Sequence, residues 1–408
     1  MKEQNNIWYV SKYVMFPEES YVGHRGHYLS KGLVSLGYKM LIINSNSFNK
    51  MRFIDFKNLY NFRELDSIHY ITIKTIKYLN SFSIKRFLSW IDFEIKLFLL
   101  PFKKKLQKPD VIIISSLSIL TILNGIIFKF KYKCKLILEI RDIWPLSLIE
   151  YKGYSKNNLF ILVLRFIEYI GYRSADKIIG TMPLLYKHVE KVIGITNKVE
   201  YIPTGYDLKM LENHIIPDQR INNILNSDKK IVTYIGSIGL ANNLNTFFKT
   251  IKKLSKNKSI FFLVIGDGEL KQKFEKDYGY LENLYFSKPV ENKYVHNILS
   301  RSHILYFSLS KNKIWEYGQS LNKLINYMLS SRPIIASYYG HKSMINEANC
   351  GEYIDVNSTS KLKKTILKFL KLSDKERSII GIRGKKWIFK HRSYKQLAKY
   401  YSEIIKQL

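Results

Sequence analysis

Short apolar runs rich in Ile, Val and Leu alternate along the chain with longer amphipathic stretches. Short apolar runs bounded by turn residues are typical of buried strands. In the first half of the chain these runs cover residues 7–14, 40–44, 111–114, 135–140, 177–180 and 200–202. Amphipathic stretches of helical length, such as 25–36 and 160–173, separate most of them. Alternating strands and helices predict a parallel sheet covered by helices on both faces.

A second series of the same kind follows the sequence IPTGYD at residues 202–207. Its apolar runs cover residues 230–235, 260–265, 283–286, 304–308, 333–336 and 351–354. Because 408 residues exceed the size at which one core usually divides, we predict two doubly wound α/β domains, 1–205 and 206–387. The basic stretch 383–408 is predicted to be helical, and its part 388–408 is expected to join the first domain.

The uncharged stretch 111–128, VIIISSLSILTILNGIIF, allows two interpretations. Its length reaches the lower limit for a helix that crosses a membrane. Its β-branched start and its several Ser, Thr and Asn residues favour a buried strand, a Ser-rich turn and a packed helix instead.

Cysteine usage and the N-terminus favour a reduced, cytoplasmic protein. Cys134 and Cys350 lie far apart in the sequence, and neither has a second cysteine at metal-ligand spacing. The first apolar stretch is short, is interrupted by Lys12 and precedes no small-residue cleavage site, so we expect no secretory signal.

The chain carries a formal charge of +33, from 66 Lys and Arg against 33 Asp and Glu. This charge predicts attraction to an anionic membrane surface, to phosphorylated substrates or to nucleic acid, although part of it reflects a general richness in Lys. The basic residues are spread over both halves without a nucleic-acid recognition motif, so we expect no nucleic-acid partner. Residues 82–105 combine aromatic and basic side chains in the pattern of a membrane-interface helix, and an ordinary packed helix is the alternative.

Glycine-containing turns follow two predicted strands of the second domain. GSIGLANNLNTF, with Gly236 and Gly239, follows residues 230–235, and a helix is predicted to start near Asn242. GDGELKQKFEK, with Gly266, follows residues 260–265. Ligands of doubly wound sheets bind at the carboxyl ends of strands, and free amides at a helix start bind phosphate. Such turns are common in α/β folds, so neither is specific alone.

In the first domain, the sequence RDIWP follows the predicted strand 135–140. Arg141 and Asp142 are therefore expected at the ligand-binding edge of that sheet, unless they form only a local ion pair. Trp144 offers an apolar face to a sugar or lipid, and packing is its alternative role. His24 and His27 near a helix start are candidates for acceptor contact or for a general base, because no carboxylate accompanies them to bind a metal.

Seven motifs in order over nearly the whole chain resemble the retaining GT-B glycosyltransferases that carry a Glu-x7-Glu motif. The resemblance is strongest to the branch from capsule and O-antigen gene clusters, many of whose members transfer N-acetylated amino sugars. The motifs are GHRGHYLSKGLVSLGYKM, RDIWPLSLIE, RSADKIIGTMP, IPTGYD, YIGSIGLANNLNTF, VIGDGELKQKF and NKLINYMLSSRPIIAS.

The resemblance implies a GT-B fold, in which two doubly wound Rossmann-like domains face each other across a cleft. It implies an acceptor-binding first domain and a nucleotide-sugar-binding second domain, without a metal or other cofactor. The expected reaction moves a sugar, with retention, from a nucleotide-sugar donor to a polyprenyl-diphosphate-linked saccharide. The donor is expected to be UDP-linked, and the protein is expected at the inner face of the plasma membrane, in bacterial capsule or O-antigen synthesis.

Carrying the family's site over to this sequence gives three groups of residues. The resemblance implies a catalytic group of Arg141, Asp142 and His27. It implies acceptor contacts from Gly23, His24 and Trp144. The implied nucleotide-sugar contacts are Gly236, Ser237, Gly239, Asn242, Gly266, Lys323 and Asn326.

The sequence also departs from the family pattern. Gly318 and Asn326 occupy the positions of the two motif glutamates. Asn326 retains the ability to hydrogen-bond a ribose hydroxyl, and Lys323, one helical turn earlier, is placed to meet the diphosphate. Arg141 stands where relatives often carry His, and a permanently charged guanidinium suits an anion but shuttles no proton. A subunit that binds without catalysing is the alternative that these losses leave open.

Overall fold

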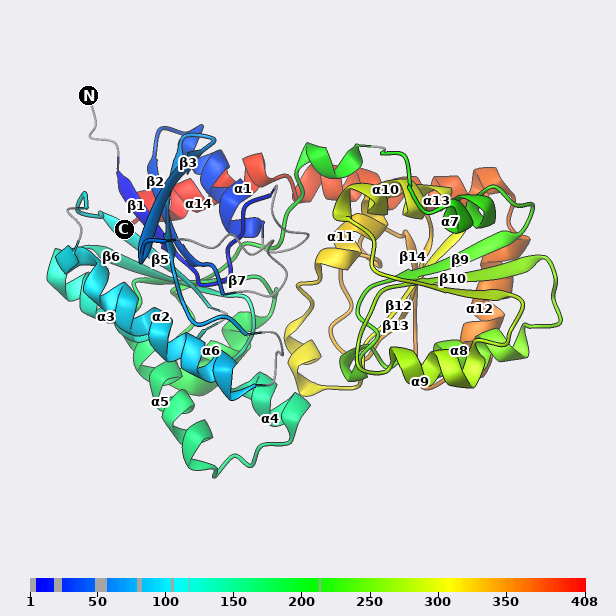
Figure 1. Ribbon diagram of the computed structural model, residues 1–408, viewed down its shortest axis with the longest axis horizontal. Helices are drawn as coiled ribbons and strands as arrows, with labels where there is room; N and C mark the ends of the chain where they lie inside the picture. The colour runs from blue at the N-terminus through cyan, green and yellow to red at the C-terminus, as the bar shows by residue number, and fades with distance from the viewer. Residues whose placement is uncertain are drawn as a thin grey trace. The chain divides into compact units, whose positions relative to one another are not determined.

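The computed structural model describes residues 5–17, 24–47, 57–78, 83–103, 106–116, 118–212 and 214–408. The chain divides into two compact units, and Figure 1 shows both with most of their helices and strands labelled. The first unit comprises Met1–Gly205 together with Tyr394–Leu408, and the second comprises Tyr206–Ser393.

The described residues of the first unit form a sheet in the order β3-β4-β2-β1-β5-β6-β7-β8. All neighbouring strands are parallel except β3, which pairs with β4 in the antiparallel direction. The strands are β1 Asn6–Val10, β2 Lys39–Ser45, β3 Tyr60–Leu65, β4 Ile68–Ile73, β5 Val111–Ser116, β6 Lys135–Ile140, β7 Lys177–Gly180 and β8 Val199–Tyr201.

Helices cover this sheet on both faces, as the alternating pattern predicts. Tyr9 belongs to a core that includes α1 and α14, while its neighbour Trp8 packs its ring against Phe128 and Tyr132 of α3 on the opposite face. The helices are α1 Arg25–Val34, α2 Ile84–Lys103, α3 Thr121–Tyr132, α4 Leu146–Lys152, α5 Leu159–Ser174, α6 Leu185–Ile193 and α14 Tyr394–Lys406.

The second unit contains a parallel sheet in the order β11-β10-β9-β12-β13-β14. Its strands are β9 Lys230–Ile235, β10 Ile260–Ile265, β11 Leu284–Ser287, β12 Ile304–Ser308, β13 Ile334–Ser337 and β14 Gly351–Ile354. Its helices are α7 Gln219–Leu225, α8 Asn245–Lys253, α9 Lys271–Tyr278, α10 Asn292–Arg301, α11 Asn322–Leu329, α12 Thr359–Lys371 and α13 Asp374–His391, with short 3-10 turns η1 Leu208–Leu211, η2 Leu240–Asn242 and η3 Lys313–Tyr317. The progression of strands through the sheet changes direction between β9 and β12. In sheets of this kind, ligands bind at the carboxyl ends of the strands beside such a point.

The sequence predicted most strands within a few residues, but it missed the hairpin of β3 and β4. Asp66 and Ser67 connect the two strands with φ of 53° and 58°, and β3 is largely exposed at the sheet edge. An exposed edge strand such as YNFREL lacks the apolar run on which the prediction depended. The single helix predicted for 383–408 is also wrong, because α13 ends at His391 and α14 begins at Tyr394.

The uncharged stretch 111–128 forms a strand followed by a helix rather than a membrane span. Residues 111–116 are β5, and residues 121–128 belong to α3. Among the residues that the structure describes, no helix combines the length and apolar character needed to cross a bilayer.

Candidate functional site

The glycine turns after β9 and β10 lie against each other. Gly236 and Gly266 have φ of 156° and 152°, which L side chains rarely adopt. A Cβ atom on Gly266 would lie 1.9 Å from the carbonyl oxygen of Gly236. The Ile238 amide also donates to the Asp267 carbonyl at 2.8 Å. These glycines therefore let the two loops form one surface beyond the strand ends.

Lys323 brings three of the predicted nucleotide-sugar residues together. Its Nζ donates to Oδ1 of Asn242 at 2.6 Å, and a Cβ on Gly236 would lie only 3.3 Å from the same Nζ. The ammonium group also lies 5.2 Å from the centre of the Tyr234 ring. Burial lowers the pKa of Lys323 to about 8, because its charge is only partly solvated.

Several contacts fix the loop that carries Asn242. The Ser308 hydroxyl donates to the Asn242 carbonyl, and the Ser310 amide donates to the Ala241 carbonyl at 2.8 Å. Asn243 follows with φ of 40° and donates through Nδ2 to Oδ1 of Asn357 at 3.3 Å. The helix expected to start near Asn242 begins later, since η2 occupies 240–242 and α8 starts at 245.

A carboxylate occupies part of the predicted phosphate surface. The Leu240 amide, directly after Gly239, donates to Oε1 of Glu269 at 3.1 Å. Ser237 between the two glycines is exposed, and its carbonyl accepts from the Tyr234 hydroxyl at 2.6 Å. Sequence reasoning missed Glu269, although its place directly after the GDG turn was a usable signal.

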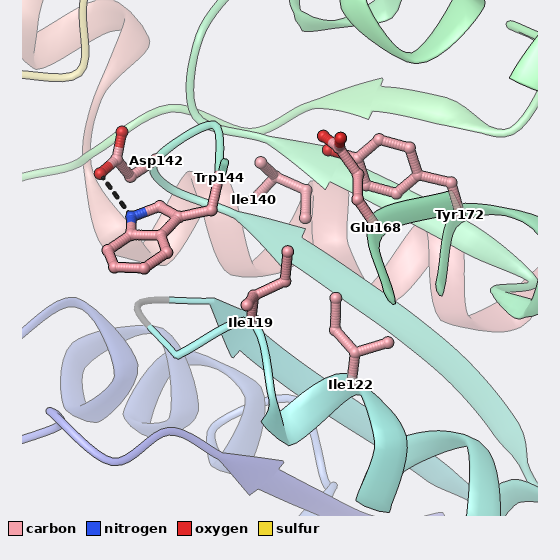
Figure 2. Close-up of a pocket in the computed structure, with 7 residues that line it drawn as sticks. All are labelled: Ile119, Ile122, Ile140, Asp142, Trp144, Glu168 and Tyr172. Atoms are coloured by element: carbon pink, nitrogen blue, oxygen red, sulfur yellow. Dashed lines mark hydrogen bonds between the residues drawn. The ribbon is translucent and has the colours of Figure 1, made fainter. Parts of the chain in front are cut away.

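In the first unit, Asp142 and Trp144 belong to one small cluster at the end of β6. Trp144 Nε1 donates to Oδ2 of Asp142 at 3.0 Å, and the Ser147 hydroxyl donates to Oδ1. Burial raises the pKa of Asp142 despite these donors. Figure 2 shows both side chains at a cavity of about 10 Å³ that Glu168 and Tyr172 also line. This volume holds at most one water molecule, so the cavity is no sugar site.

Arg141, unlike Asp142, has a buried hydrogen-bond donor without a partner among the described residues. This donor is Nη1, while the rest of the side chain is partly exposed. Buried donors in native proteins nearly always have partners, so an oxygen of a bound ligand is a natural one. This arrangement suits the predicted role of Arg141 toward an anion.

A buried network that the sequence did not reveal lies beneath Arg141. Glu139 accepts from Arg25 Nη2 at 2.9 Å, from the Tyr9 hydroxyl at 2.7 Å and from the Ser115 hydroxyl at 2.8 Å. Burial alone would raise the pKa of Glu139, but the Arg25 charge outweighs it and lowers that pKa. Arg25 also donates to the Ile202 carbonyl at 2.9 Å. The network joins α1, β1, β5 and β6, and its signal was a Glu inside an apolar strand.

The predicted histidines contact residues of α1 and of the β3–β4 hairpin. His27 is buried, with Nδ1 2.6 Å from the Tyr70 hydroxyl and Nε2 3.1 Å from Oδ2 of Asp66. Burial lowers its pKa to about 4. With both ring nitrogens engaged, this geometry favours a structural role for His27 over acid–base chemistry. His24 precedes α1 and meets the Tyr28 ring edge-on, while Gly23 lies outside the described residues.

Comparisons with known proteins match the second unit to a family and the whole chain to a fold. Residues 216–387, which make up most of the second unit but less than half of the chain, match the family model of Glycosyl transferases group 1. No curated protein sequence gives a significant match.

Solved structures resemble the chain over its whole length. Sucrose-phosphate synthase from Thermosynechococcus elongatus aligns with a TM-score of 0.75 and 14% identity, covering 99% of each chain. The E. coli trehalose-6-phosphate structure bound with UDP-2-fluoro glucose gives 0.73 and 11%, also covering 99% of each. Anabaena HepE in complex with UDP and glucose gives 0.66 and 10%, covering 99% of this chain and 100% of its own. The fold is GT-B.

Within this GT-B fold, the two departures from the glutamate motif have different structural settings. Gly318 follows η3 with φ of 104°, so a glutamate there would strain the backbone. Asn326 lies on α11 one turn after Lys323 and is partly exposed. No hydrogen bond of its side chain is found within the described parts of the chain, which leaves its amide available to a ligand hydroxyl.

Proposed function

We propose that this protein is a retaining, metal-independent glycosyltransferase that moves an N-acetylated sugar from a UDP-linked donor to a lipid-linked saccharide. The group 1 glycosyltransferase match in residues 216–387 and the GT-B fold support the reaction class. The proposed setting is capsule or O-antigen synthesis at the inner face of the plasma membrane, where a polyprenyl diphosphate carries the acceptor.

The observation that carries the proposal is the setting of Lys323. Its partly buried ammonium has a neutral amide, Asn242, as its hydrogen-bond partner. No ion pair to a carboxylate is found for it in the part of the chain that the structure describes. A desolvated cation without a counter-ion, beside glycine turns at the strand ends, is matched by the diphosphate of a nucleotide sugar.

The chemistry assigned to the site is stabilisation of charge rather than proton transfer. When the bond between sugar and diphosphate breaks, negative charge grows on the leaving oxygen, and Lys323 would stabilise it. We assign the nucleotide ribose to Asn326. Arg141, with its unpaired Nη1, would meet an anionic oxygen of the acceptor, while Asp142 is held by Trp144 and Ser147 and shapes the loop.

Thermal-shift binding of UDP, GDP and TDP and their sugars, with and without EDTA, tests the proposal. We expect UDP and one UDP-sugar to raise the Tm, equally with EDTA, because basic side chains and loop amides hold the diphosphate. The absence of stabilisation by every nucleotide would contradict the proposal.

A second candidate function is a GT-B subunit that binds a nucleotide without transferring its sugar. The observation in its favour is the loss of both motif glutamates, at Gly318 and Asn326. It predicts the same rise in Tm with UDP, but no turnover of any UDP-sugar when a lipid-linked acceptor is present.

A further inference from the structure

The helices α2, α3 and α5 expose an unusual amount of apolar surface. They cover one face of the sheet in the first unit, with α3 packed against both α2 and α5 (Figure 1). Large exposed apolar patches on a protein mark interaction sites. The most exposed large apolar side chains of this α2–α3–α5 face are Ile84 at 79%, Leu159 at 77%, Phe130 at 71%, Phe102 at 66%, Phe166 at 63% and Ile95 at 55%.

The first turns of α2 and α5 meet and concentrate this apolar surface. The Phe87 ring of α2 lies 6.1 Å from the Phe160 ring of α5, edge to face. Tyr154, in the loop before α5, lies 6.4 Å from the same Phe160 ring. Ile84 and Leu159, the two most exposed large apolar side chains of the face, begin these two helices.

The charges on the face have one sign. Its exposed charged side chains are basic, and they are Lys85, Lys131, Arg165 and Arg173. The described parts of the three helices contain three carboxylates, and each is engaged inside the fold. Asp92 pairs with Lys96 at 2.7 Å, Glu94 accepts from the Thr121 hydroxyl at 2.6 Å, and Glu168 meets His188 at 2.7 Å.

We propose that the α2–α3–α5 face binds the surface of an anionic lipid bilayer, with the first turns of α2 and α5 entering deepest. Exposed aromatic and aliphatic side chains flanked by Lys and Arg, without exposed carboxylates, complement the headgroup boundary of such a bilayer. A second copy of this chain is a poor occupant, because it would bring the same basic face and another formal charge of +33 against the first.

The face is connected by aromatic contacts to the loop after β6, which carries Arg141. The Phe87 ring lies 6.3 Å from Trp90, Trp90 lies 5.4 Å from Trp144, and Trp144 donates to Asp142 at 3.0 Å. Docking through the starts of α2 and α5 therefore holds the end of β6 near the headgroups. This consequence rests on the proposed function, because only a lipid-linked acceptor would present its diphosphate there.

Vesicle co-sedimentation tests the proposal with the full chain. The vesicles are phosphatidylcholine alone or phosphatidylcholine with phosphatidylglycerol, and the variant carries both Ile84→Glu and Leu159→Glu. The matched control is Ile215→Glu in the second unit, where the side chain is 89% exposed. We expect wild type and control to bind anionic vesicles and to release them at high salt, and the double variant to bind at least ~10-fold more weakly.

Equal binding of the double variant and wild type would overturn the proposal. So would a wild-type dimer, measured by light scattering, that the double variant loses, because the face would then be an interface between copies. UDP thermal shifts of the same proteins separate this inference from the proposed function. If UDP still stabilises the double variant but the variant no longer binds vesicles, only membrane docking has been lost. If wild type binds vesicles but no nucleotide raises its Tm, the proposed function alone is contradicted.

Discussion

Replacing Lys323 by Met removes the charge that the candidate donor site depends on and keeps most of the apolar stem. In the wild type, Nζ is 2.6 Å from Asn242 Oδ1 and has no carboxylate to compensate it within the described residues. A hydrogen bond between a charged group and a ligand contributes about 1.5–3 kcal/mol. At about 1.4 kcal/mol per factor of ten, the dissociation constant of UDP should rise about 10- to 150-fold.

Isothermal titration of UDP measures this change. Lys368→Met is a suitable control, because Lys368 is an exposed lysine of the same unit that pairs with Glu352 at 2.8 Å. The control should bind UDP like wild type. An unchanged dissociation constant in Lys323→Met, with the fold intact by circular dichroism, would refute the placement of the diphosphate beside Lys323.

The pH dependence of the same titration gives an independent check. Burial lowers the pKa of Lys323 to about 8, so the free protein loses this charge in mildly basic solution. Because the diphosphate binds the charged form, wild-type affinity should be constant below this pKa and fall above it. Lys323→Met should show no such fall, and parallel pH profiles of the two proteins would contradict the assignment.

Three further predictions concern the neighbouring loops and the buried network. Glu269→Gln removes a negative charge beside the diphosphate surface, so UDP should bind about 2- to 5-fold more tightly by titration, and weaker binding would count against that surface. Gly266→Ala should lower urea stability by roughly 2 kcal/mol or more, because its Cβ would lie 1.9 Å from a carbonyl oxygen; Gly37→Ala, at a φ of 93° with open space around it, is the control and should lose less. Glu139→Gln leaves Arg25 buried without its counter-charge and should cost about 3–5 kcal/mol in urea unfolding. Since the pKa of Glu139 is lowered, its contribution is present above its usual pKa and lost as the pH falls through the lowered value; a variant as stable as wild type at neutral pH would contradict this.

The sequence predicted the second unit more fully than the first for a physical reason. Strands such as β9, β10 and β12 are largely buried on both faces, and their apolar runs mark both ends of each strand. β3 lies at an edge with exposed side chains, so its pattern was not distinctive. The break between α13 and α14 had a signal that the prediction did not use, because Ser393 and Gln396 have the spacing of a capping box directly before α14.

The candidate site was predicted in part. Glycine turns at strand ends and the family resemblance identified Gly236, Asn242 and Lys323, which the structure brings together. The buried network next to Arg141 could not be predicted, because Arg25 meets Glu139 at a separation of 114 residues. Local sequence likewise did not show that both ring nitrogens of His27 would be engaged.

Sugar transfer from a UDP-sugar releases UDP, so a UDP-release assay measures the proposed reaction itself. Wild type and Lys323→Met are incubated with UDP-N-acetylated sugars, with and without lipid-linked saccharide in anionic vesicles. We expect wild type to release UDP only when the acceptor is present, and Lys323→Met to release it at least ~10-fold more slowly. If wild type binds UDP but releases none from any UDP-sugar, even with the acceptor present, transfer is contradicted. The second candidate, a subunit that binds without transferring, is then favoured.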